Sequence, residues 1–249
     1  RLEVFMNNTI EILLEHKSIR KYTEKHITQD VIDTIVSCAQ MAPTSSHFQA
    51  YTIIEVKNKD KRKLLSEWAG GQKWVENAPL VLMFCGDLHR AYKYYENIDR
   101  EILTNTEQYT VATVDAALAA QKALIAAQGL GLGGVFVGGI RNEVENISNE
   151  FNLPELVFPL FLVCMGYPAD DPGIKPRLPQ GAVHKIDFYD ESQDDSLIEE
   201  YNNIVSKYYE ERTKGKENDR WTERCGKYLT AKPRYNVGDF FRKIGLLKK

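Results

Sequence analysis

A continuous apolar run, PLVLMFCG at residues 79–86, constrains the fold of this chain more than any other segment. An unbroken run of this length is typical of a central strand that is buried on both faces, so it needs structure above and below it. The segment YTIIEV at 51–56 predicts a second strand, because it is rich in β-branched and aromatic residues. Two further strands are expected in GGVFVGG at 133–139 and in LVFPLFLVCMGYP at 156–168, where Pro159 predicts a sheet edge or a bulge.

Segments with helical periodicity supply the layers that such a sheet needs. Polar and apolar residues at helical spacing predict a helix over residues 9–15, and Thr28 can cap a second helix that continues through Ala39. The Ala-rich segment 107–128 predicts a long helix. Because alanine allows close packing, we expect this helix to be the central one. The predicted fold class is therefore α+β, with several strands enclosed by helices.

The run GLGLGG at residues 129–134 satisfies the pattern G-x-G-x-x-G. In a dinucleotide fingerprint this pattern follows a strand and opens a helix. Here it follows a helix and opens a strand, so the order is reversed. Gly129 is better explained as a helix C-cap, with the remaining glycines in a tight turn. We therefore expect no Rossmann-type nucleotide site.

The chain length of 249 residues suits one well-buried domain, or one domain with a helical extension. After about Asp190 the composition shifts to an acidic, tyrosine-rich helical segment without a core of its own. We predict a core over residues 6–190 and a C-terminal helical extension over 191–249 that packs on the core or on a partner subunit. Residues 1–5, which precede Met6, are interpreted as an expression remnant.

Composition and charge exclude several classes of function. The net charge of −3 provides no basic footprint for nucleic acid, so any anion site must be local. The four scattered cysteines, without any CxxC, favour a reducing cytoplasmic location. No run is read as long enough to span a bilayer, and no signal peptide is expected. The histidines show no metal-ligand spacing and no G-x-S-x-G elbow is present, so neither a metal site nor hydrolytic machinery is predicted.

Two short basic segments lie far apart in the chain, His16-Lys17-Ser18-Ile19-Arg20 and Lys175-Pro176-Arg177. Each alone would be read as a solvated surface patch. Together they offer fixed cations, a hydroxyl and an imidazole, which suit a phosphate and a second anionic centre.

The segments around these patches strengthen that interpretation. EILLEHKSIRKYTEKHI, MAPTSSHFQAYTII, AGGQKWVENAPLVLMFCGD, ALIAAQGLGLGGVFVGGIRN and GYPADDPGIKPRLPQGAVHK occur in this order. The set resembles the FMN-dependent nitroreductase family, and within it the oxygen-insensitive NADPH nitroreductases and NADPH–flavin oxidoreductases. The resemblance implies a nitroreductase-like fold, dimeric, with a mostly antiparallel central sheet and a C-terminal helical extension. It also implies bound FMN and NADPH as the hydride donor.

The activity implied is reduction of nitroaromatics, quinones or free flavin by a ping-pong hydride transfer through flavin N5. No protein residue is then catalytic, because the cofactor performs the chemistry. By the same resemblance, His16 and Ser18 are phosphate ligands, with Lys17 contributing charge or backbone. Lys175 and Arg177 close on the phosphate, and Arg20 lies near the N1/O2 edge, where a fixed cation stabilises the reduced ring.

The resemblance implies three further groups of cofactor contacts. One loop reaches over a flavin bound mainly by the other subunit, through Thr44, Ser45, Ser46 and Gln49, while relatives often carry another residue at His47. Gln72 and Lys73 contact the pyrimidine edge and rim. The backbone of Val137, Gly138 and Gly139 runs along one flavin face, with the Gly139 N–H directed at N5, an approach that glycine permits.

The basic cluster Arg212, Lys214 and Lys216 has two interpretations. It is either a solvated loop or the recognition site for the NADPH 2′-phosphate, which requires cations that NADH does not. Glu217 and Asn218 stand where relatives are basic. Two alternatives to the reductase also stay open: a flavin-binding carrier or sensor without turnover, and a specialised reductase of another small acceptor such as a nitrosothiol.

Overall fold

The computed structural model describes residues 7–95, 97–231 and 233–248. The predicted expression remnant, residues 1–5, lies outside this part of the chain. The described residues divide into two compact units. The sheet unit comprises the residues up to Pro172 and those from Arg234 onward, and the C-terminal helical unit comprises Gly173–Pro233.

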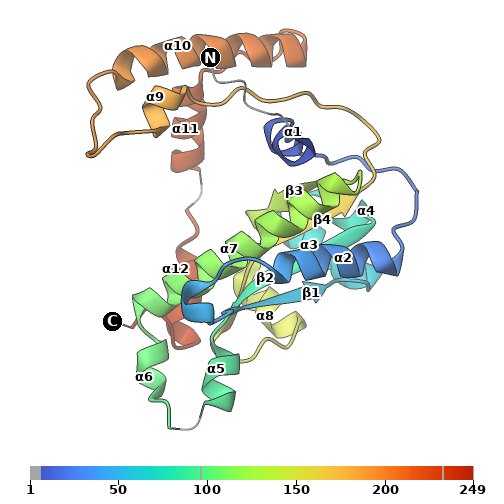
Figure 1. The fold of residues 1–249 in the computed structure, drawn as a ribbon, viewed down its shortest axis with the longest axis vertical. Helices are drawn as coiled ribbons and strands as arrows, with labels where there is room; N and C mark the ends of the chain where they lie inside the picture. Colours follow the sequence, from blue (N-terminus) through green and yellow to red (C-terminus); the bar gives the residue numbers. More distant parts are fainter. Residues whose placement is uncertain (1–6, 96, 232, 249) are drawn as a thin grey trace. The chain divides into compact units, whose positions relative to one another are not determined.

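Four antiparallel strands form the sheet in the order β1-β2-β4-β3 (Figure 1). They are β1 (Tyr51–Glu55), β2 (Leu80–Asp87), β3 (Gly133–Val137) and β4 (Val157–Gly166). All four match segments predicted from sequence, and every residue of β2 is buried, as expected for a central strand. The prediction of an α+β fold around an antiparallel sheet is confirmed.

Pro159 causes a bulge rather than marking an edge. It lies in β4, which is interior to the sheet, between β2 and β3. The register between β2 and β4 shifts after the pair Phe84–Phe161, so that Cys85 faces Pro159 and Leu160 becomes the extra residue. Because proline has no N–H to donate to the ladder, an interior strand tolerates it at such a shift.

Within the described residues, the sheet unit contains nine α-helices and two short 3₁₀ segments. They are α1 (Asn8–Leu14), α2 (Gln29–Gln40), η1 (Ser45–His47), α3 (Lys59–Trp68), α4 (Lys73–Asn77), α5 (His89–Tyr94), α6 (Arg100–Leu103), α7 (Thr106–Gly129), η2 (Gly138–Glu143), α8 (Val144–Glu150) and α12 (Tyr235–Lys243).

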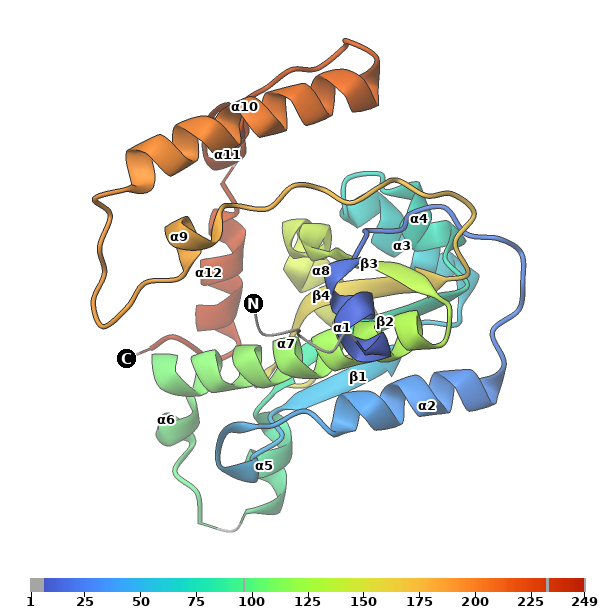
Figure 2. The ribbon, with the colours of Figure 1, turned by 45° about the horizontal axis from the view of Figure 1, so that its top comes forward.

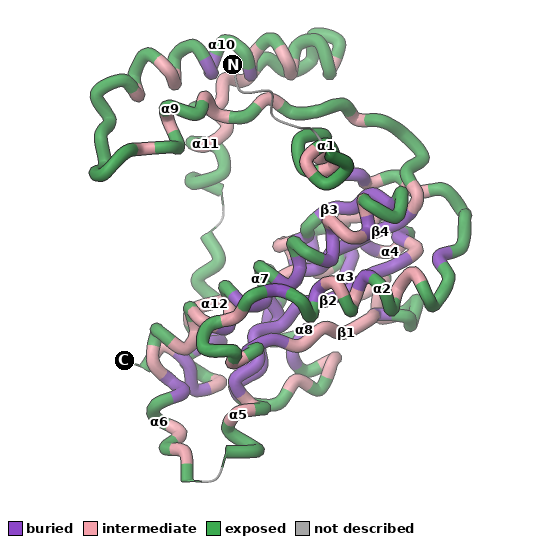
Figure 3. The backbone as a smooth tube through the Cα atoms, viewed as in Figure 1, coloured by how far each residue is buried: buried purple, intermediate pink, exposed green. Residues whose placement is uncertain are grey.

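The sheet has a buried core on each face. Leu82 and Phe84 of β2 belong to the core that includes α2 and α7, whereas Val81 and Met83 belong to the core that includes α3, α4 and α8. This alternation follows from the two-residue period of a strand. Figures 1 and 2 show α2 and α7 on the same side of the sheet, and Figure 3 shows the buried residues concentrated in the strands and in α7.

The central helix α7 is close-packed through alanines. Ala112, Ala116, Ala119, Ala120 and Ala123 are all fully buried. By length and composition alone α7 is also long and apolar enough to cross a membrane, so the expectation that no segment reaches that length was wrong. Core helices pass the same test, and the alanine face buried against the sheet identifies α7 as one of them.

The turn after α7 confirms that GLGLGG is no dinucleotide fingerprint. Gly129 is the last residue of the helix, and Gly131, with φ of 80°, makes the left-handed turn into β3. The order is helix, turn, strand. The expectation that Gly129 is the C-cap was wrong by one residue, since Leu130 holds that position, whereas the tight turn expected for the following glycines is formed at Gly131.

The C-terminal helical unit contains α9 (Gln180–Val183), α10 (Asp194–Thr213) and α11 (Trp221–Thr230). Tyr201 of α10 packs edge-on against Trp221, and the buried Asn202 Oδ1 accepts hydrogen bonds from the N–H and hydroxyl of Thr222. The boundary expected near residue 190 falls inside this unit, because the acidic composition begins there whereas the packed segment already begins at Gly173. The chain then returns to the sheet unit, where Phe241 of α12 contacts Phe158.

Candidate functional site

The N-terminal basic segment runs beside the edge strand β3. Ser18 forms a parallel bridge with Gly134, and the Ile19 N–H donates to the Gly134 carbonyl at 3.0 Å. Ile19 is buried, whereas Ser18 and Arg20 on either side are half-buried. In extended backbone successive side chains alternate in direction, so the buried Ile19 turns its polar neighbours away from the core.

Arg20 lies against an aromatic ring. Its guanidinium carbon is 5.4 Å from the ring centroid of Trp74, and its Nη1 donates to the Ser18 carbonyl at 3.3 Å. Cation–π contact of this kind orients a guanidinium without neutralising its charge. The Trp74 Nε1 is buried and has no hydrogen-bond partner within the described residues. The Arg20 guanidinium therefore lies beside an indole whose N–H has no acceptor among the described residues.

A buried phenol holds this part of the segment in place. The Tyr22 hydroxyl lies 2.9 Å from the Ile19 carbonyl and 3.1 Å from the Cys164 carbonyl. Burial, followed by the neighbouring Cys164, raises the pKa of Tyr22 far above its ordinary value, although Arg20 acts in the opposite direction. The phenol therefore stays protonated and remains a donor to the backbone.

The other two polar residues of the segment already have partners. Lys17 Nζ forms an ion pair with Asp171 Oδ2 at 2.8 Å, and His16 Nδ1 lies 3.3 Å from Gln128 Nε2. The Lys17 side chain is 27% exposed. Because Asp171 compensates its charge, Lys17 offers an anion less attraction than an unpaired lysine would.

At the C-terminal end of β3, two predicted site residues, Gly139 and Gln72, lie close together. Gly138 and Gly139 begin η2 directly after Val137, and a Cβ placed on Gly139 would lie 2.6 Å from both the Ala69 carbonyl oxygen and Gln72 Nε2. Gln72 Nε2 itself donates to Ala69 O at 2.6 Å. Packing alone thus requires glycine at 139, in addition to the cofactor-based reason expected from sequence. Lys73 begins α4 and its Nζ is 3.4 Å from Glu76.

These features line one strand of the sheet unit. Gly134 of β3 lies beside Ser18, and Gly138 follows the last residue of β3, so the two glycines are four residues apart, or about 13 Å of extended chain. Arg20 reaches Trp74, which is two residues beyond Gln72 and belongs to α4. The structure therefore places the His16–Arg20 segment, the Gln72–Trp74 segment and the Val137–Gly139 segment around the same edge strand.

The loop from Thr44 to Ala50 is held by a buried carboxylate. Asp115 of α7 accepts the Ser45 N–H at 3.1 Å on Oδ1 and the Ala50 N–H at 3.0 Å on Oδ2. Ser45, Ser46 and Gln49 are exposed, whereas Phe48 packs against the core. The sequence analysis missed Asp115, and the one signal for it was an acid within the alanine-rich part of the helix.

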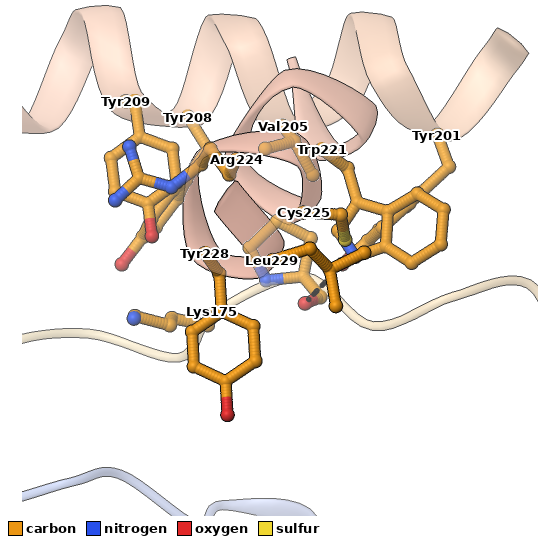
Figure 4. Close-up of a pocket in the computed structure, with 11 residues that line it drawn as sticks. Lys175, Tyr201, Val205, Tyr208, Tyr209, Trp221, Arg224, Cys225, Tyr228 and Leu229 are labelled. Atoms are coloured by element: carbon orange, nitrogen blue, oxygen red, sulfur yellow. Dashed lines mark hydrogen bonds between the residues drawn. The ribbon is translucent and has the colours of Figure 1, made fainter. Parts of the chain in front are cut away.

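Lys175, Pro176 and Arg177 belong to the C-terminal helical unit. Arg177 Nη1 donates to the Lys175 carbonyl at 2.7 Å, and the Tyr201 hydroxyl donates to the Pro176 carbonyl at 3.0 Å. Lys175 also lines a pocket of about 400 Å³ whose walls include five aromatic side chains, with Tyr209 and Trp221 among them (Figure 4). That this segment and the His16–Arg20 segment share one phosphate stays a prediction.

The third basic cluster lies where α10 ends. Arg212 in the last turn donates to the Tyr208 hydroxyl, and Lys214 is the C-cap with φ of 54°. The carboxylate of Glu217 forms an ion pair with Arg224 at 3.1 Å. The negative charge of Glu217 is therefore compensated, so this residue is a weaker obstacle to an anion than the sequence suggested.

No thiol among the buried cysteines is suited to nucleophilic chemistry. Cys85 and Cys164 are free and buried in the core. Burial raises the pKa of Cys164 to about 12, with Arg62 lowering it only in part, and burial raises that of Cys85 further. Both thiols stay protonated at neutral pH and serve as packing residues.

Comparison with known proteins decides the family. Residues 13–167 match the nitroreductase family, and residues 175–249 match the C-terminal domain of the nitroreductase family. The chain belongs to the nitroreductase family. FMN reductase (NADPH) from Bacillus subtilis (strain 168) is 42% identical over 248 residues, covering 98% of this chain and 100% of the relative. Oxygen-insensitive NADPH nitroreductase from Salmonella typhimurium is 35% identical over 96% of this chain and 98% of the relative.

A solved structure confirms the nitroreductase-like fold. The NfrA1 nitroreductase from B. subtilis matches with a TM-score of 0.94 and 41% identity, over 97% of this chain and 100% of that chain. The family resemblance and the fold class inferred from sequence are both confirmed.

The residues of this nitroreductase fit a flavin phosphate. Within five residues the His16–Arg20 segment offers an imidazole, an ammonium, a hydroxyl and a guanidinium, and the Trp74 Nε1 nearby lacks an acceptor. Such a donor set suits a group rich in acceptors and negative at one edge. Of the supporting residues, the sequence analysis missed Trp74 and Gln128, because their contacts join segments far apart in the chain.

Proposed function

We propose that this protein is an FMN-dependent NADPH oxidoreductase whose cofactor lies along β3. The observation that carries the proposal is the meeting of three predicted cofactor segments around that edge strand. As a member of the nitroreductase family with NADPH-dependent FMN reductases among its relatives, the protein is an NADPH-dependent flavin oxidoreductase. Its cofactor is FMN and its electron donor is NADPH.

Bound FMN supplies the hydride chemistry at its N5 atom, and the protein binds, orients and tunes it. In this proposal His16 and Ser18 would hold the phosphate together with Lys175 and Arg177, and Lys17, paired with Asp171, would contribute less. Arg20, kept in place by Trp74, would lie at the N1/O2 edge, where its fixed charge would stabilise negative charge on the ring. The backbone of Val137, Gly138 and Gly139 would follow the ring face, and Gln72 and Lys73 would lie at its rim.

No protein acid or base is required for this reaction, because protons can come from solvent. We infer a ping-pong order, in which NADPH delivers its electrons and leaves before the acceptor enters the same space. Nitroaromatics, quinones and free flavin are the acceptors proposed. The free cysteines favour a reducing, cytoplasmic location.

We further propose a homodimer in which the Thr44–Gln49 loop reaches the flavin of the other subunit. The support is an exposed apolar surface on the sheet unit. Val114 and Leu118 of α7 are 48% and 40% exposed, and Leu14 of α1, which packs beside α7, is 64% exposed. Apolar side chains gathered on neighbouring elements are typical of a subunit interface.

Arg212, with Lys214 and Lys216, is the proposed recognition site for the NADPH 2′-phosphate. Replacing Arg212 with alanine is expected to raise the KM for NADPH about tenfold or more, because a hydrogen bond to a charged group contributes about 1.5–3 kcal/mol. The KM for NADH should stay unchanged. Steady-state kinetics with both donors checks this. Lys207→Ala on the same helix is the matched control, and equal effects of Arg212→Ala on both donors would remove the proposed role.

The absorption spectrum of the purified protein, followed by a turnover assay, tests the proposed function. We expect a flavin spectrum after gel filtration, and oxidation of NADPH when a nitroaromatic, a quinone or free FMN is added. A colourless protein that takes up no FMN would refute the proposal. A flavin-loaded protein that oxidises no NADPH with any of these acceptors would instead support the alternative, a carrier or sensor.

A further inference from the structure

We propose that Asp115 is a positioning residue of the cofactor site, which forces the loop over residues 44–50 into a strained shape and thereby aims its polar side chains outward. This inference rests on the proposed function, because the loop includes residues proposed to contact FMN. It concerns a side chain that would not touch the cofactor itself.

The contacts of Asp115 join the two ends of the loop. Its carboxylate is 1% exposed and lies 70 residues from Ser45 and 65 residues from Ala50 in the chain. Each oxygen accepts one backbone N–H, at 3.1 Å from Ser45 and at 3.0 Å from Ala50. One rigid side chain thereby sets the distance between the loop's ends, and hydrogen bonds to a carboxylate are stronger than those between neutral groups.

The backbone between these two points is strained. Ser46, His47 and Gln49 have φ values of 50°, 58° and 54°, in the left-handed region. Residues other than glycine disfavour this region. They remain in it where the surrounding structure holds them there. The two Asp115 bonds provide that constraint from the helix side.

A second set of contacts fixes the C-terminal end of the loop from the sheet side. The Asp87 N–H donates to the Ala50 carbonyl at 2.9 Å, and Arg90 Nη1 donates to the Tyr51 carbonyl at 3.2 Å. Ala50 is therefore held through both its N–H and its carbonyl. The N-terminal end at Ser45 depends on Asp115 more strongly, which makes that end the sensitive one.

The strain has a consequence for what the loop presents. Phe48 alone turns inward and packs on the core, whereas Ser45, Ser46, His47 and Gln49 are exposed. Gln49 Nε2 lies 3.3 Å from His47 Nε2, so these two side chains form a pair. A relaxed loop would lose this arrangement and with it the pre-positioned contacts that reduce the entropy lost on binding.

Helix stability gives no reason for an acid at this position. Ala112, Ala116, Ala119 and Ala120 around Asp115 are buried, and alanine is the better helix former. A buried carboxylate is unfavourable unless hydrogen bonds compensate it. Because its two recorded hydrogen bonds both go to the loop, positioning of the loop explains why the acid is there.

Amide hydrogen exchange tests the two Asp115 hydrogen bonds before any substitution is made. In the flavin-free wild-type protein the Ser45 and Ala50 amides should exchange at least tenfold more slowly than the amides of Ser46 and Gln49. Exchange of the Ser45 amide as fast as that of Ser46 would overturn the proposal. This measurement is independent of FMN. It therefore separates a failure of the Asp115 proposal from a failure of the proposed function.

Asp115→Asn then tests positioning. The amide has one oxygen in place of two, so one loop N–H loses its acceptor. We expect exchange of the Ser45 or Ala50 amide to speed up at least tenfold, and the dissociation constant for FMN to rise about tenfold in a fluorescence titration. Asn105→Ala, which removes the N-cap of the same helix, should lower the Tm while leaving both quantities unchanged. A lower Tm for Asp115→Asn with an unchanged FMN dissociation constant would show a merely structural role and refute the proposal.

Discussion

The variant Lys175→Ala/Arg177→Ala is expected to lose most of its FMN on gel filtration. Within residues 7–95, 97–231 and 233–248 neither cation forms an ion pair, so both charges are available to an anion. Hydrogen bonds to charged groups contribute about 1.5–3 kcal/mol each. Each single substitution should therefore weaken FMN binding roughly 10- to 150-fold, and the double substitution more strongly.

Fluorescence titration with FMN measures these dissociation constants. Lys17→Ala provides an internal comparison, because Asp171 already compensates the Lys17 charge and the expected loss is smaller. Lys63→Ala, at an exposed position of α3 in the sheet unit, controls for a general loss of positive charge. Unchanged FMN affinity in the double variant would remove Lys175 and Arg177 from the phosphate site and leave the His16–Arg20 segment as its main candidate.

Gly139→Ala has the second large expected effect, on stability and on the flavin together. A methyl group at this position would lie 2.6 Å from the Ala69 carbonyl oxygen, which is backbone and cannot rotate away, and equally close to Gln72 Nε2. Overpacking of this kind destabilises by about 1–3 kcal/mol. For a chain of this size the Tm should fall by roughly 2–12 °C. FMN binding should weaken as well, because Gln72 is displaced.

Differential scanning calorimetry and FMN titration of Gly139→Ala measure the two effects. The matched control is Gly226→Ala on α11, where a Cβ meets nothing within 4 Å. Because alanine favours helix over glycine, that variant should be neutral or slightly stabilised. If Gly139→Ala retained both the wild-type Tm and the wild-type FMN affinity, the close packing of Gly139 against Gln72 would be refuted.

Several features of the fold followed from local patterns. Apolar runs and β-branched and aromatic content identified the strands, and helical spacing and alanine content identified α2 and α7 within a residue or two. The reversed order around GLGLGG excluded a Rossmann site because that argument needs only the neighbouring elements. The two basic segments and the flanking motifs led to the correct family for the same reason: each motif is contiguous in the chain.

Other features needed the packed structure. In the sequence, Pro159 was compatible with either a sheet edge or a bulge. The strand order places β4 inside the sheet, and its register with β2 shifts at Pro159, so the structure has a bulge. The boundary expected near residue 190 followed composition, whereas the observed units follow packing. Gly139 was assigned to cofactor approach, and the structure adds that Ala69 and Gln72 leave no room for a side chain.

By itself the sequence determined the elements, the family and the residue types that a flavin phosphate requires, because these depend on short contiguous segments. Only the tertiary structure decided which charges are already paired and which loops are held. Lys17 meets Asp171 across 154 positions, and Asp115 meets Ser45 across 70. Contacts between residues so far apart form only when strands and helices pack, so no local pattern encodes them. For that reason Asp115, unremarkable in the sequence, becomes the residue on which the shape of the proposed flavin-contacting loop depends.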